Sequence, residues 1–205
     1  MEYPRRVSFQ GTVVNDDFRL IDEALAGNAA SFGKLVQKYQ DRLYNTMLHI
    51  VRSPEEAEDV VQDAFVQAFV KLHTFARTSA FYTWLYRIAF NVSVSRQRRK
   101  RPTISVDATY DATGVEPAGH EDTPDEILER QESIRQVHHT LERLDDASRS
   151  ILVLREFDGM SYEQISQVLD LPLGTVRSRL HRARLQLREE LSELLGSHPT
   201  SHDLT

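Results

Sequence analysis

The pattern that most limits the fold lies in residues 161–188, where two short runs of helical periodicity flank a turn that contains proline. Ser161 is followed three residues later by Gln164, the spacing of a capping box, so a helix should begin at Tyr162. Pro172 ends this helix, because proline clashes with a continuing helical turn. Beyond the proline, four apolar residues share a narrow arc that must face the first helix: Val176, Leu180, Ala183 and Leu187. The pattern predicts a helix-turn-helix unit.

The second of these helices concentrates positive charge in a chain whose formal net charge is −6. It carries five arginines with no acidic residue among them: Arg177, Arg179, Arg182, Arg184 and Arg188. Ser178, His181 and Arg182 point away from the apolar arc, and other arginines lie on both flanks. Such a helix suits a major groove, where its tip reads bases and its flanks grip phosphates. The alternative is a solvated amphipathic helix at the end of a bundle, but the coincidence of spacing and charge favours DNA binding.

Composition excludes several classes of function. The 205 residues include no cysteine, which removes disulfides, thiol catalysis and cysteine-ligated metal and fits a reducing compartment. No run approaches the ~18 apolar residues of a membrane span. Residues 1–15 lack the apolar core of a signal peptide. We therefore expect a soluble, cytoplasmic protein.

Helical patterns dominate the chain and strand patterns are almost absent, so the fold is predicted to be all-α. Residues 102–125 differ, because they are acidic, contain several prolines and glycines, and have too little apolar surface to offset the entropy of ordering. We predict two small helical domains joined by this flexible acidic linker, with the helix-turn-helix in the second. The boundaries are a disordered leader 1–16, a first domain 17–101, the linker 102–125, a second domain 126–195 and a disordered tail 196–205.

The first domain has its own candidate for nucleic-acid binding. Aromatic and cationic residues alternate between Phe75 and Arg101, a combination that suits an unpaired strand because rings stack on bases while cations follow the backbone. However, Phe81, Trp84 and Leu85 share one helical face, so most of the rings are expected in a core. The residues alone leave strand binding and core packing both open.

Catalysis has little support in the sequence. Paired acids such as Asp145 and Asp146 stand at predicted helix starts, where capping explains them. His138 and His139 are adjacent and so face different directions on a helix, unlike an i, i+4 metal pair. No phosphate-binding glycine loop or nucleophile motif occurs. We predict no catalytic residue, no metal site and no cofactor.

Four motifs of this sequence resemble motifs of one known family, and they occur in the same order as in that family. The segment 79–91, SAFYTWLYRIAFN, resembles the promoter-melting segment of bacterial extracytoplasmic-function (group IV) RNA polymerase sigma factors, in the sigma-70 family. The segment 53–72, SPEEAEDVVQDAFVQAFVKL, is similar to the polymerase-binding helix of that family. The segments LREFDGMSYEQIS and LPLGTVRSRLHRAR resemble its carboxy-terminal promoter-reading domain. Together they cover most of residues 20–194.

The resemblance implies an initiation factor that binds core RNA polymerase and directs it to −10 and −35 promoter elements for an alternative or stress regulon. It makes residues 17–101 sigma domain 2 and residues 126–195 sigma domain 4. The implied polymerase-binding residues are Asp59, Gln62, Asp63 and Gln67. The implied −10 residues are Arg77, Thr78 and Ser79 in a base-capturing loop, Tyr82, Trp84 and Arg87 behind it, and Arg98 near the duplex. The implied −35 residues are Arg177, Ser178, Arg179, His181, Arg182 and Arg184. The family also implies an inhibitory anti-sigma partner and a linker that crosses the polymerase.

The chain departs from the family pattern at three points. Arg77-Thr78 stands where the family often has Gly-Asp or Gly-Glu, which leaves the base preference at −10 open. Ser95 replaces a common acidic or amide residue, and Asp145 replaces a frequent proline while still able to cap a helix.

Two other classes of function stay open. A polymerase-independent helix-turn-helix repressor or activator would explain residues 161–188 but not the helix from Ser53 or the aromatic segment. A helical interaction protein would use its basic patches only for solubility.

Overall fold

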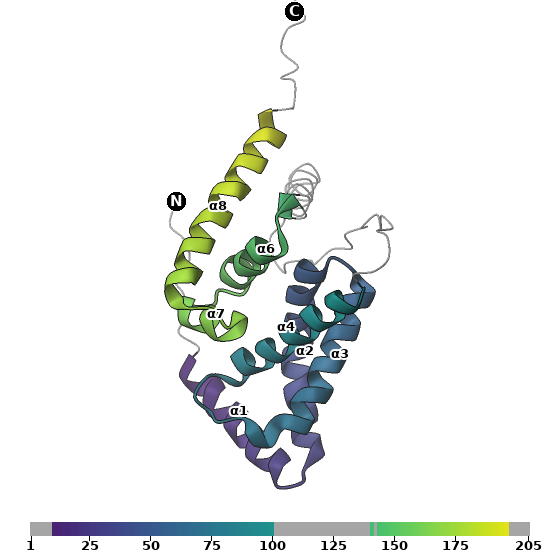
Figure 1. Cartoon of the computed structure of the whole chain (residues 1–205). Helices are drawn as coiled ribbons and strands as arrows, with labels where there is room; N and C mark the ends of the chain where they lie inside the picture. The colour runs from purple at the N-terminus through teal and green to yellow at the C-terminus, as the bar shows by residue number, and fades with distance from the viewer. Residues whose placement is uncertain (1–9, 101–139, 142, 197–205) are drawn as a thin grey trace, which may run out of the picture.

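The computed structural model describes residues 10–100, 140–141 and 143–196, and no strand occurs among them (Figure 1). The prediction of an all-α protein with two helical domains is confirmed. The first domain contains α1 (Gln10–Leu25), α2 (Ala29–Val51), α3 (Pro54–Lys71), the 3₁₀ turn η1 (Leu72–Thr74) and α4 (Phe81–Lys100). The second domain contains α6 (Asp146–Leu152), the π-helical turn η2 (Val153–Phe157), α7 (Tyr162–Leu169) and α8 (Leu173–Gly196).

The helix-start signals in the sequence are confirmed. The Ser53 hydroxyl accepts a hydrogen bond from the Glu56 amide, with Pro54 as the first residue of α3. Ser161 and Gln164 form the reciprocal capping box at the start of α7, with hydrogen bonds of 2.8 and 3.2 Å. Of the two aspartates considered for α6, Asp145 is the cap. It accepts from the amides of Ala147 and Ser148, and its hydrogen bonds to Ser148 lower the pKa of its carboxyl group.

Some boundaries differ from the prediction. Helix α1 begins at Gln10, within the leader that was predicted to be disordered up to residue 16. No proline or glycine lies between Thr12 and the buried Asp17, so nothing in that stretch breaks a helix. The sequence predicts a helix over residues 147–156, but α6 ends at Leu152, because the chain then widens into the π-helical turn η2. The linker 102–125, residues 126–139 and residues 197–205 lie outside the described residues.

The core of the first domain lies between α2, α3 and α4. Its buried apolar residues include Leu35, Leu43, Met47, Val60, Ala64, Ala68, Leu85 and Ala89. The aromatic segment contributes to this core. Phe81 is 1 % exposed and contacts Phe75 and the half-buried Trp84, with ring centroids 5.8 Å apart in both pairs. Core packing therefore accounts for part of the aromatic segment.

The second domain is built on the predicted contact between α7 and α8. Ile165 and Val168 of α7 are buried together with Val176, Leu180 and Ala183 of α8, while Leu187 is partly buried. The turn between the helices passes through Asp170 in the left-handed region (φ 53°). Helix α8 packs on α6 and α7 and projects from the rest of the molecule (Figure 1).

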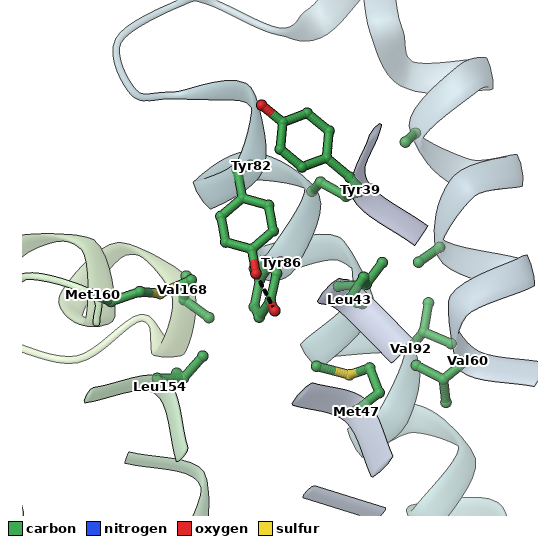
Figure 2. Packing of buried hydrophobic residues seen from close by; sticks show 14 of the residues in the cluster. Tyr39, Leu43, Met47, Val60, Tyr82, Tyr86, Val92, Leu154, Met160 and Val168 are labelled. Carbon is green, nitrogen blue, oxygen red and sulfur yellow. Dashed lines mark hydrogen bonds between the residues drawn. The ribbon is translucent and has the colours of Figure 1, made fainter. Parts of the chain in front are cut away.

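The two domains pack against each other. Helix α4 lies beside α7, and α2 contacts α6 and η2 (Figure 1). Figure 2 shows Leu154, Met160 and Val168 of the second domain on one side of Tyr82 and Tyr86, with Leu43 and Met47 of α2 on the other. A single apolar cluster thus continues from one domain into the other.

Candidate functional site

The basic helix α8 presents its polar tip to solvent. Ser178, His181 and Arg182 are exposed, as expected from the apolar arc on the opposite side of the helix. The Arg182 side chain folds back along the helix, where Nε donates to the Ser178 carbonyl oxygen at 3.4 Å. Arg177 is exposed as well, and Arg179 is half-buried on the other flank. Four of these five residues are thus exposed on α8, and Arg179 is the exception.

Arg184, the sixth residue predicted for this surface, is engaged within the protein. Its Nε and Nη2 atoms donate to one Glu156 carboxylate oxygen at 3.0 and 2.6 Å, which raises the pKa of Arg184. This pair joins α8 to η2. Arg184 is therefore less available to a phosphate than its neighbours, although its side chain is still 47 % exposed.

The loop between η1 and α4 has an uncommon backbone conformation at Arg77. Arg77 adopts positive φ (57°), a conformation that favours glycine. The Arg77 guanidinium is held by an ion pair to Asp22 and lies 5.5 Å from the ring centroid of Phe18. Both partners belong to α1. Thr78 is exposed and Ser79 is half-buried, so the loop presents small polar groups beside an anchored arginine.

The other predicted −10 residues are not all open to solvent. Tyr82 was expected behind the loop, but it is 7 % exposed and its hydroxyl donates to Asp158 of the second domain at 2.8 Å. Burial, together with Tyr86 and Asp158, raises its pKa. Arg87 is half-exposed and its Nη2 atom lies 3.8 Å from Asp170 Oδ1. Trp84 is half-buried and Arg98 is exposed. In this arrangement the second domain covers part of the predicted −10 surface.

The residues predicted to bind polymerase lie on α3. Asp59 and Gln62 are exposed, while Asp63 and Gln67 are partly exposed. Arg96 of α4, which sequence reasoning did not single out, bridges two of them. Its Nη1 atom donates to Asp59 Oδ2 at 2.6 Å, and its Nε and Nη2 atoms donate to Asp63 Oδ2 at 3.0 and 2.6 Å. These hydrogen bonds raise the pKa of Arg96, and those to Asp63 make the largest contribution.

A groove and an apolar strip adjoin the same carboxylates. The groove has a volume of about 540 Å³. It lies between α3 and α4 and is lined by Asp63, Gln67, Asn91, Val92, Ser95, Arg96 and Arg99. Further along α3, Val66, Phe69 and Val70 are 58, 48 and 65 % exposed. Exposed apolar side chains beside a polar face are typical of protein-binding surfaces. Their spacing of three and four residues is the only sequence signal for this strip.

Metal ligands and membrane spans can be assessed for residues 10–100, 140–141 and 143–196. In that part of the chain, no three His, Cys, Asp or Glu side chains gather closely enough to hold a metal ion. No helix described there is both long enough and apolar enough to cross a membrane. His138 and His139 lie outside these residues.

The fold and these surfaces define a class: a two-domain, all-helical protein with a helix-turn-helix in its second domain. Two family models match the chain, "Sigma-70 region 2" over residues 35–103 and "Sigma-70, region 4" over residues 134–187. The RNA polymerase sigma-H factor of Pseudomonas aeruginosa is 39 % identical over 184 residues, covering 87 % of this chain and 95 % of that protein. The ECF RNA polymerase sigma-E factor of Escherichia coli K12 is 39 % identical over 182 residues, covering 86 and 94 %.

Two solved structures of similar proteins point to the same family or fold. The structure of CnrH in complex with the cytosolic domain of CnrY is 30 % identical, with a TM-score of 0.62, and covers 90 % of this chain and 99 % of that one. The sigma factor RpoE of Bartonella quintana, solved with the anti-sigma factor NepR, has a TM-score of 0.60 at 22 % identity, covering 82 and 98 %, and shows the same fold. The chain belongs to the sigma-70 family, in its extracytoplasmic-function group.

Proposed function

We propose that the chain is a bacterial transcription initiation factor that binds core RNA polymerase and directs it to −10 and −35 promoter elements of an alternative or stress regulon. The observation that carries this proposal is the separation of two kinds of surface. An arginine-rich helix with an exposed tip lies in one domain, and an acidic and apolar helix face lies in the other. Membership of the sigma-70 family supports the pairing of these surfaces in one protein.

The −35 element is read by α8. Arg177, Ser178, Arg179, His181 and Arg182 supply contacts to base edges and phosphates, and the exposure of the helix tip supports this role. Arg184 contributes more through its bond to Glu156, which keeps η2 beside the helix. Phosphate contacts from the cationic flanks would fix the orientation of this helix in a major groove.

The −10 element is opened by the loop of the first domain. Arg77, Thr78 and Ser79 receive an extruded base, with Trp84 as the nearby ring and Arg87 and Arg98 as cations for the backbone. Extruding a base costs a few kcal/mol, roughly the amount that one or two stacking contacts return. The anchoring of Arg77 by Asp22 and Phe18 supports a preformed pocket, because the loop is ordered before the base arrives.

Polymerase is bound by α3. Asp59, Gln62, Asp63 and Gln67 form its polar part, and we add the apolar strip Val66, Phe69 and Val70 as the adjoining part. An inhibitory anti-sigma factor is a second protein partner, as the family resemblance implies. The chain acts by binding and not by catalysis, and its place of action is the cytoplasm, where the polymerase works.

The −35 assignment predicts a loss of discrimination in Arg182→Ala. Removing a side chain that contacts a base edge should cost about 1–3 kcal/mol of discrimination at one −35 position. Arg177→Ala should behave similarly at another position. The measurement is transcription by the holoenzyme from a set of promoters, each with one −35 base pair changed.

The matched control is Arg188→Ala, which removes an exposed arginine further along the same helix. If Arg188 contacts a phosphate, removing it should weaken binding to all sequences alike and reduce the salt dependence, without changing base preference. If both Arg177→Ala and Arg182→Ala transcribe every −35 variant as the unmodified chain does, the assignment is wrong.

A polymerase-independent regulator is the second candidate for the helix-turn-helix. It predicts tight and specific binding of duplex DNA by the chain alone. The initiation factor predicts weak binding of duplex DNA until polymerase is present, because the chain as a whole is acidic (net charge −6).

A further inference from the structure

The contact between the two domains is centred on a buried carboxylate. Asp158 follows η2, and its side chain is 3 % exposed. It accepts hydrogen bonds from the Tyr82 hydroxyl at 2.8 Å on Oδ1 and from the Thr46 hydroxyl at 2.7 Å on Oδ2. Arg42 donates two more hydrogen bonds, from Nε to Asp158 Oδ1 at 3.2 Å and from Nη2 to the Asp158 backbone oxygen at 2.9 Å. Each of these donors belongs to the first domain.

A second layer of hydroxyls supports the donors. The Tyr86 hydroxyl lies 3.1 Å from Asp158 Oδ1 and donates to Thr46 Oγ1, and the Tyr82 hydroxyl contacts that of Tyr86. The Arg42 guanidinium also lies 4.0 Å from the centroid of the Tyr82 ring. Tyr82 and Tyr86 are both buried, so their hydroxyls need an acceptor when the domains are together. The Asp158 carboxylate is the acceptor for Tyr82, while Tyr86 donates to Thr46, whose own hydroxyl donates to Asp158.

Other polar contacts continue along the same interface. The buried Arg149 donates from Nη1 to the Ile50 carbonyl oxygen at 3.3 Å, at the end of α2. Gln97 of α4 donates to Asp146 Oδ2 at 2.7 Å, and Arg87 approaches Asp170 in the turn of the helix-turn-helix. Interfaces rich in polar groups are typical of domains that separate and rejoin.

The closed arrangement cannot read a complete promoter. The −35 and −10 elements lie about 25 base pairs apart, roughly 85 Å of duplex at 3.4 Å per base pair. In the structure, a residue of the predicted −10 surface, Arg87, lies 3.8 Å from Asp170, which immediately precedes the turn into α8. The domains must therefore part before each can occupy its own element.

We propose that Asp158 is an intramolecular latch. It holds the free chain closed by accepting hydrogen bonds within a cluster of donors: Arg42, Thr46, Tyr82 and Tyr86. Promoter binding requires that Asp158 leave this cluster. Once the domains part, the carboxylate and the hydroxyls return to water, so neither domain is left with an unpaired buried group. The consequence for promoter reading rests on the proposed function, while the latch itself does not.

The absence of cysteine makes the test simple. Cysteines introduced at two exposed positions, Gln37→Cys in α2 and Glu189→Cys in α8, carry spin labels whose separation is measured by double electron–electron resonance. The labelled chain should give one narrow, short distance. Adding Asp158→Ala should raise the ratio of open to closed molecules roughly 30-fold or more, the factor expected when one partner of a buried, hydrogen-bonded charge is removed. This appears as a longer and broader distance distribution.

Two further variants make the result decisive. Thr46→Val keeps the shape of the side chain but removes one donor to Asp158, so it should shift the distribution the same way by a smaller factor. Asp41→Ala removes an exposed carboxylate from α2 and should leave the distribution unchanged. If Asp158→Ala does not fold by circular dichroism, Thr46→Val decides. If Asp158→Ala folds and its distance distribution is unchanged, the latch is overturned. If it does not fold, an unchanged distance distribution in Thr46→Val overturns the latch.

The unmodified labelled chain is then mixed with core polymerase and a promoter fragment. The distance should lengthen as the complex forms, and a short distance in a complex that initiates transcription would overturn the need for release. A chain that opens on Asp158→Ala yet never supports initiation would confirm the latch and reject the proposed function.

Discussion

Asp63→Arg is expected to weaken binding to core RNA polymerase by about 100-fold or more, because reversing a charge within a complementary interface replaces attraction by repulsion. The effect should be large at this position for a second reason. Asp63 holds Arg96 through Nε and Nη2, so the variant would place two guanidinium groups together and leave Arg96 with Asp59 as its remaining carboxylate partner on α3. The measurement is the dissociation constant for purified core polymerase, obtained by titrating a fluorescently labelled chain.

Asp41→Arg is the matched control for this charge reversal. It changes an exposed carboxylate on α2 and makes no change to the face of α3. The control should bind polymerase as the unmodified chain does, and both variants should retain the helical circular dichroism signal. Undiminished co-purification of Asp63→Arg with the core enzyme would count against the α3 face.

Arg149→Met is expected to lower the free energy of unfolding by about 3–5 kcal/mol. Arg149 is 2 % exposed, and its guanidinium donates to the carbonyl oxygens of Leu141 at 2.9 Å and Leu144 at 2.5 Å. Burial lowers its pKa, yet these carbonyls and Asp146 favour the charged form. Methionine fills similar space but cannot donate, so the buried carbonyl groups of Leu141 and Leu144 would lose the guanidinium as a donor.

Urea unfolding followed by circular dichroism measures this loss. Arg188→Met, an exposed arginine on α8, is the control and should change the free energy of unfolding by less than about 0.5 kcal/mol. A value for Arg149→Met within about 1 kcal/mol of the unmodified chain would show that the guanidinium is not needed in the second domain.

Local signals in the sequence were enough to place the starts of α3, α6 and α7. The caps at Ser53, Asp145 and Ser161 and the break at Pro172 act within one or two turns, so residue type and spacing determine them. The apolar arc of α8 also follows from spacing alone, because a helix turns by a fixed angle per residue. The exposed tip of the helix-turn-helix was predictable for the same reason.

Contacts between distant segments were not predictable in this way. Arg96 was visible only as part of a basic run, since nothing local says that its guanidinium meets carboxylates 33 and 37 residues earlier. Asp158 is followed by Gly159 at positive φ (64°). That the Asp158 side chain enters the other domain depends on how the domains pack. The burial of Tyr82 follows from the same packing.

The anchoring of Arg77 lies between these cases. The departure from glycine was visible in the sequence, but the positive φ and the ion pair to Asp22 depend on α1, whose beginning was placed too late. A leader assumed to be disordered could not be used to locate a partner for the loop.

Run-off transcription with purified core polymerase that carries no other sigma factor tests whether the chain directs the polymerase to promoters. Genomic fragments serve as templates, and the start sites of the transcripts are mapped. Addition of the chain should produce initiation at a defined set of sites that share −10 and −35 sequences. If the chain binds duplex DNA tightly by itself but gives bare polymerase no start-site selection on any fragment, it is a polymerase-independent regulator and not an initiation factor.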